Sequence, residues 1–124
     1  MKTNRPVNLD LSTIHFPMPA IVSILHRISG IIVFVGMAFL LYGLDVSLSG
    51  REGFSAVAGF MDHFLVKLIV WGTLAALAYH LVAGVRHLIM DMGIGETLEG
   101  GRLGAKLTFI VSAIIIVLLG VWIW

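Results

Sequence analysis

The sequence predicts an all-α integral membrane protein, a bundle of three transmembrane helices. Two properties of the 124-residue chain point to this fold, because 59% of its residues are hydrophobic and only 12% are charged. Soluble domains average about 25% charged residues. A water-soluble domain of this size could not bury so much apolar surface, since small domains bury the smallest fraction of their chain. The third observation is that the apolar residues gather in three long runs.

Each run is long enough to cross a bilayer, whose hydrocarbon core takes about 20 residues of helix. The predicted spans cover residues 20–49, 62–92 and 106–124. Helices are expected because backbone polar groups find no water inside lipid. Pro17 and Pro19 mark the start of the first helix, since proline is tolerated in a first turn but not further in. Residues 1–19 then form a polar N-terminal segment, and residues 20–124 form one transmembrane domain.

The basic residues predict how the bundle is oriented. Six lie on the side of the N-terminus and of the second connection, residues 92–106, and two lie on the other side: Lys2, Arg5, Arg27, Arg86, Arg102 and Lys106 against Arg51 and Lys67. Positive charge favours the cytoplasmic side of a membrane. The N-terminus is therefore predicted to be cytoplasmic.

Composition also excludes several classes of function. The net charge of +1 gives no electrostatic reason to expect a nucleic acid partner. The chain has no cysteine, which excludes disulfides, thiolate-bound iron–sulfur clusters and covalently attached c-type haem.

One group of polar residues stands where the first helix enters the membrane, in the segment SILHRISG. Ser23, His26 and Arg27 share one helix face, because residues three and four apart are neighbours on a helix. Gly30 leaves that face open to the close approach of a ligand. Alternatively the group is an interfacial patch in which Arg27 reaches the anionic headgroups.

A second group forms a stripe on the second span, where His80, Gly84, His87 and Asp91 are spaced by four, three and four residues. His80 lies about 15 Å from the cytoplasmic end of the helix, too deep for an imidazole to reach the surface. It either ligates a metal or haem, with Gly84 leaving room for a flat ring, or hydrogen-bonds a neighbouring helix. Arg86 and His87 are nearer the interface, where we expect their side chains to extend towards the surface.

Both groups match signatures of the cytochrome b anchor family of succinate dehydrogenase. The first signature is Arg-Pro, an apolar stretch and then S-x-x-H-R-x-S, and the second is H-x-x-x-G-x-R-H-x-x-M-D-x-G. The residues that match are Arg5, Pro6, Ser23, His26, Arg27 and Ser29, then His80, Gly84, Arg86, His87, Met90, Asp91 and Gly93. The chain resembles this family over essentially its whole length.

The resemblance implies a role for each of several positions. His80 falls on the axial ligand of the iron of haem b, and the sixth ligand would come from a histidine of a second anchor subunit. Ser23 and Arg27 fall on the ubiquinone site. His26 and Arg27 also fall where a haem propionate is held, and His87 is expected to contact the cofactor as well.

The resemblance also implies an assembly. The chain would pack with the second anchor subunit, an iron–sulfur subunit and a flavoprotein in the bacterial inner membrane, and would itself carry no catalytic residue. Electrons from succinate oxidation would pass to ubiquinone. Two alternatives stay open: a fumarate reductase-type anchor that works with menaquinone, and a purely structural anchor in which His80 and Arg27 serve helix packing.

Overall fold

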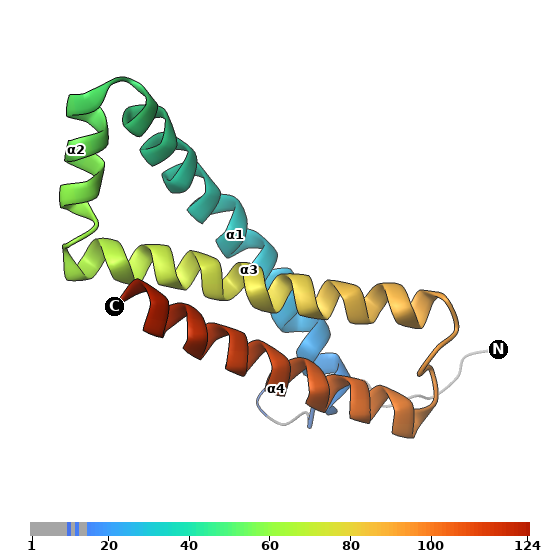
Figure 1. Cartoon of the computed structure of the whole chain (residues 1–124). Helices are drawn as coiled ribbons and strands as arrows, with labels where there is room; N and C mark the ends of the chain where they lie inside the picture. Colours follow the sequence, from blue (N-terminus) through green and yellow to red (C-terminus); the bar gives the residue numbers. More distant parts are fainter. Residues whose placement is uncertain (1–9, 11, 13–14) are drawn as a thin grey trace.

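A computed structural model of the chain describes residues 10, 12 and 15–124, so that Lys2 and the Arg5-Pro6 pair of the first signature lie outside the described residues. Every regular element in the described part is a helix (Figure 1). The four helices are α1 (Met18–Leu48), α2 (Arg51–Phe60), α3 (Phe64–Asp91) and α4 (Leu98–Ile123). The predicted all-α fold is confirmed.

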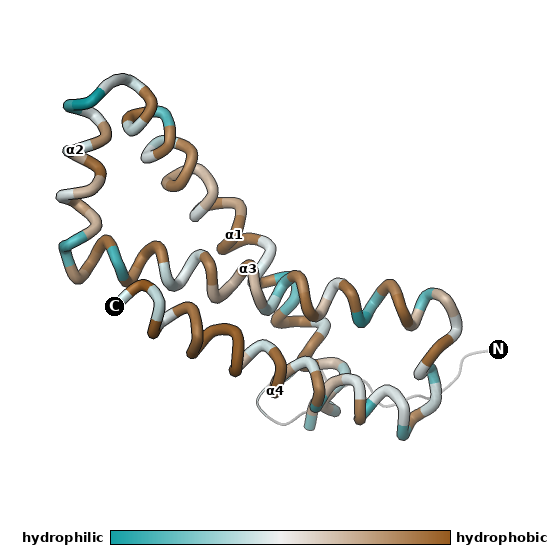
Figure 2. The backbone as a smooth tube through the Cα atoms, in the orientation of Figure 1, coloured by the Kyte–Doolittle hydropathy of each residue, from teal (hydrophilic) through white to brown (hydrophobic). Residues whose placement is uncertain are grey.

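Three of these helices, α1, α3 and α4, are long and apolar enough to cross a membrane, as the sequence predicts. Apolar side chains cover their outer surfaces, and Figure 2 shows hydrophobic residues along the length of each one. The buried apolar side chains in the described residues are few and mostly small: Val22, Ala78, Ala83 and Ala105. This arrangement suits a lipid solvent, in which helices associate through small residues that let their backbones come close.

The connections between the spans are more helical than the sequence indicates. The first contains α2, which starts after Gly50, a residue with a φ of 148° that favours glycine. The second is short, because α4 begins at Leu98 rather than near residue 106. The Thr97 side chain caps α4 by accepting a hydrogen bond from the Gly100 amide.

The three long helices meet at the end of the molecule where α1 and α4 begin. Val22 of α1, Ala83 of α3 and Ala105 of α4 form one buried cluster there. At the opposite end, the Trp71 indole donates a hydrogen bond of 2.9 Å to the Ile116 carbonyl, and the Trp124 ring packs edge-on against Trp71. Helix α4 is thus fixed to α3 along its whole length.

Helix α1 crosses α3 obliquely, and the two diverge towards α2 (Figure 1). Two glycines of α1 permit the crossing. A Cβ atom at Gly36 would overlap the Thr73 side chain, and one at Gly30 would lie only 3.1 Å from Cε1 of His80. The polar stripe of α3 is therefore placed directly against α1.

Candidate functional site at the crossing of α1 and α3

Three histidines from two helices come together at this crossing. The imidazole rings of His26 and His80 are stacked, with their centroids 4.1 Å apart and an angle of 5° between their planes. The His87 ring is tilted by 57° against His26, with a centroid separation of 5.2 Å. All three side chains are half-buried. We call His26, His80 and His87 the histidine cluster.

Hydrogen bonds around His80 determine which of its ring nitrogens carries the proton. The Ser29 hydroxyl donates to the His26 carbonyl oxygen at 2.8 Å, so towards His80 the Ser29 Oγ acts as an acceptor. Nδ1 of His80 lies 2.9 Å from that Oγ and 3.1 Å from the same carbonyl oxygen. Because both neighbours are acceptors, Nδ1 is the protonated nitrogen, and in the neutral imidazole Nε2 then carries the lone pair.

A second polar contact anchors the helix next to the cluster. The Tyr79 hydroxyl donates a hydrogen bond of 2.9 Å to the Val22 carbonyl of α1. The ring of Tyr79 stacks on Phe109 of α4, with 6.2 Å between centroids. The residue before His80 therefore ties α3 to both neighbouring helices and limits how far the His80 ring can move.

Gly84 of α3 lies beside the imidazole ring of His26. A Cβ atom there would lie 3.5 Å from Nε2 of His26, so the space beside Gly84 holds the His26 imidazole. That this position leaves room for a flat cofactor stays a prediction. In the structure each glycine of the site lies beside a histidine, Gly30 beside His80 and Gly84 beside His26.

The predicted quinone residues flank His26 on α1, with Arg27 directly after it and Ser23 three residues before it. Ser23 is half-buried and Arg27 is exposed. Within the described part of the chain, neither side chain forms a hydrogen bond or an ion pair. Neither forms a hydrogen bond with His80, whose contacts with the SILHRISG segment come from His26 and Ser29.

Arg86 differs from its expected position. It is only 8% exposed and donates a hydrogen bond of 3.2 Å from Nη2 to the Gly101 carbonyl of α4, rather than extending to the membrane surface. Ser29 has no predicted role beyond its place in the signature, although its spacing of three residues from His26 places both on one face of α1. Tyr79 is not among the predicted site residues, because nothing near it in the sequence reveals the partner of its hydroxyl.

Comparison with known proteins identifies the family of the chain. Residues 1–119 match the family described as succinate dehydrogenase/fumarate reductase transmembrane subunit. The chain belongs to this family. Membership places it in the membrane part of an oxidoreductase complex, and its three apolar helices fit a membrane location.

Individual members of the family are similar over most of their length. The succinate dehydrogenase cytochrome b556 subunit of Coxiella burnetii is 47% identical over 125 residues, which cover 100% of both chains. The cytochrome b556 subunit of Paracoccus denitrificans is 30% identical over 93% of this chain and 88% of its own length. The cytochrome b560 subunit of Marchantia polymorpha is 35% identical, over 75% of this chain and 72% of its own.

Proposed function

We propose that this chain is the haem b-binding anchor subunit of succinate dehydrogenase and that, with its partner subunits, it delivers electrons from succinate oxidation to ubiquinone. The observation that carries the proposal is the pair of acceptors at Nδ1 of His80, which leaves Nε2 as a free electron-pair donor. A neutral imidazole in this state is the form that binds haem iron.

The surroundings of His80 fit this role in two further ways. A ligating histidine almost always donates its other N–H to an oxygen, and Ser29 with the His26 carbonyl supplies that oxygen. His80 is only half-buried by its own chain, so a cofactor at Nε2 would be shared with a second anchor subunit that supplies the other axial histidine. The relatives are named as cytochrome b subunits, in keeping with such a cofactor.

The other members of the cluster would hold the periphery of the cofactor. The His26 ring stacks on His80, the His87 ring lies against His26, and Arg27 stands on the next position of α1. Such groups can donate hydrogen bonds to the propionates of haem b. When bound, haem b supplies reversible one-electron storage. The chain itself would orient the iron ligand and hold the proton of the neutral ring at Nδ1.

Ubiquinone would bind on the adjoining face of α1. Ser23 offers a hydroxyl donor to a quinone carbonyl, and Arg27 offers a fixed positive charge. Reduction brings two electrons and two protons to the ring, so negative charge develops on its oxygens before both protons arrive. A preorganised cation next to those oxygens stabilises that charge. Neither side chain forms a hydrogen bond or an ion pair within the described residues, so both donors are available to a substrate.

The chemistry of succinate oxidation would take place in other subunits. It requires a flavin and an iron–sulfur relay, and this chain has no cysteine to ligate a cluster. We therefore expect assembly with a flavoprotein, an iron–sulfur subunit and a second anchor in the bacterial inner membrane. The chain alone would have no catalytic activity.

The decisive experiment is the reduced-minus-oxidised spectrum of the purified complex. The wild-type complex should show b-type absorbance that is reduced by succinate, and His80→Leu should remove it because the axial ligand is lost. His63→Leu is the matched control, since His63 is exposed at the other end of α3. A wild-type complex without b-type absorbance would leave the chain as a purely structural anchor. An unaltered spectrum in His80→Leu would show that His80 is not the iron ligand.

A further inference from the structure

Arg86 is a buried cation without a counter-ion in the described part of the chain. Its side chain is 8% exposed, and its single hydrogen bond runs from Nη2 to the Gly101 carbonyl. Nε is buried and has no partner. Charges removed from water are normally paired, because an isolated buried charge is strongly unfavourable. The guanidinium therefore lacks the anion that this degree of burial calls for.

Nearby acids do not supply that anion. Asp91, Glu96 and Glu99 stand in or beside the connection between α3 and α4, and all three are exposed. Among the described residues, none of them forms an ion pair with Arg86. The Arg86 side chain packs instead against the backbone of α4 at Gly104. The contact is so close that a Cβ atom added at Gly104 would lie 3.2 Å from Nε of Arg86. Its charge is directed into the space between the helices.

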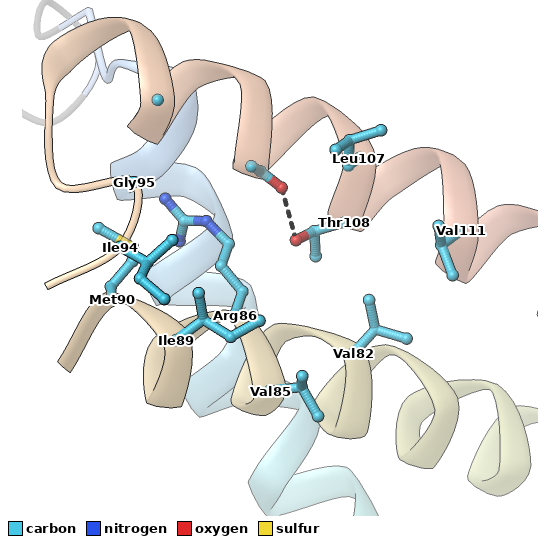
Figure 3. Close-up of a pocket in the computed structure, with 12 residues that line it drawn as sticks. Val82, Val85, Arg86, Ile89, Met90, Ile94, Gly95, Leu107, Thr108 and Val111 are labelled. Atoms are coloured by element: carbon cyan, nitrogen blue, oxygen red, sulfur yellow. Dashed lines mark hydrogen bonds between the residues drawn. The ribbon is translucent and has the colours of Figure 1, made fainter. Parts of the chain in front are cut away.

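That space is a cleft of about 240 Å³ between α3 and α4. Arg86 lies in it near Ile94 and Gly95 of the connecting turn, and the cleft continues between the two helices along apolar side chains (Figure 3). These side chains are Val82, Val85 and Ile89 of α3 and Leu107 and Val111 of α4. The cleft thus has one cationic end and one apolar arm.

We propose that this cleft binds an anionic membrane lipid, with the phosphate of the headgroup at Arg86 and an acyl chain along the apolar arm. Basic pockets between transmembrane helices are suited to anionic headgroups. The guanidinium fork matches the oxygens of a phosphate and is less strongly hydrated than an ammonium group. Arg102 and Lys106, exposed near the start of α4, add positive charge at the same end of the helix. This inference is independent of haem and quinone.

The test uses the assembled complex, stripped of lipid in detergent and titrated with phosphatidylglycerol or with phosphatidylcholine. Native mass spectrometry counts the lipids retained. The wild-type complex should retain phosphatidylglycerol in preference to phosphatidylcholine. Arg86→Gln should raise the half-saturating phosphatidylglycerol concentration about tenfold, as expected for loss of a charge-assisted hydrogen bond. Arg51→Gln is the control, since Arg51 is exposed at the start of α2, away from the cleft, and should change it by less than about threefold.

Three results would overturn the proposal. Equal retention of both lipids by the wild-type complex would point to an acid of another subunit as the partner of Arg86. An unchanged titration in Arg86→Gln would place the lipid elsewhere. Suppression of phosphatidylglycerol binding by equimolar inorganic phosphate would assign the site to the free anion. If Arg86→Gln does not assemble, a photoreactive acyl chain on phosphatidylglycerol keeps the test open in the wild type, where cross-links must map to residues 82–111.

Discussion

The imidazole rings of His26 and His80 lie parallel across the interface of α1 and α3, with 4.1 Å between their centroids. The backbone carbonyl of His26 and the Ser29 hydroxyl face Nδ1 of the same His80 ring. A single turn of α1 therefore sets both the position and the protonated nitrogen of the proposed iron ligand. Three predictions follow from the residues that build this crossing.

Ser29→Ala should raise the midpoint potential of the bound haem. The substitution removes one acceptor at Nδ1 of His80, which makes the imidazole a weaker donor and disfavours the oxidised iron. A hydrogen bond worth about 0.5–1.5 kcal/mol corresponds to a rise on the order of 20–60 mV for one electron. Potentiometric titration of the b-type absorbance measures it.

Ser47→Ala provides the control for this titration. The Ser47 hydroxyl donates to the Leu44 carbonyl three residues earlier, the same local bond that Ser29 makes, but no histidine contacts it. The midpoint potential of the haem in the Ser47→Ala complex should match that of the wild type. An equal shift in both variants would mean that the hydroxyl acts through α1 itself and not through His80.

Arg27→Ala should lower ubiquinone reduction by succinate while leaving the reduction of a soluble dye unchanged. Loss of a preorganised charge next to the developing negative oxygen typically costs about 10²–10³ in rate. Arg27→Lys should recover part of the activity, because it restores the charge without the planar fork. Steady-state assays with both acceptors measure the difference.

The control for Arg27 is Arg51→Ala, since Arg51 is also exposed but stands at the far end of the molecule, at the start of α2. It should retain both activities. If Arg27→Ala lost dye reduction to the same extent as quinone reduction, the residue would be needed for assembly, and its assignment to the quinone site would fail.

Gly36→Ala should destabilise the chain, because the new Cβ atom would overlap the Thr73 side chain at the crossing. Overpacking of this kind costs about 1–3 kcal/mol. Gly43→Ala in the same helix is the control, since a Cβ atom there meets nothing within 4 Å. Thermal melting of the purified complex compares the two. Equal melting temperatures would show that α1 and α3 do not approach as closely as the structure has them.

Much of the fold follows from the sequence, because long apolar runs have few structural solutions in lipid. His80 could be singled out for the same reason, since its depth gives an imidazole no access to the surface. That His26 stacks on His80 does not follow from the sequence in this way. The stacking depends on the angle at which α1 crosses α3. That angle arises from the close approach of Gly36 and Thr73, and neither helix alone carries a pattern that predicts it.

The helical glycines of α4 and the buried Arg86 both differ from the prediction because the sequence does not show which helix faces pack together. The glycines at the start of α4 suggest a loop, because glycine is a poor helix former. In the structure Gly101 and Gly104 are helical and let Pro19 and Arg86 pack against the backbone of α4. The depth of Arg86 in α3 predicts a side chain near the surface, but depth does not reveal which side of α3 another helix covers.

The length of α1 has a consequence for the site. Its 31 residues extend about 46 Å, well beyond the roughly 30 Å of a hydrocarbon core, and a helix of excess length tilts to match the bilayer. Because α1 also runs obliquely to α3 (Figure 1), the two helices cannot both stand upright in a bilayer. The stacked rings of His26 and His80 join these two inclined helices. We therefore expect any change in the angle between α1 and α3 to alter this stacking.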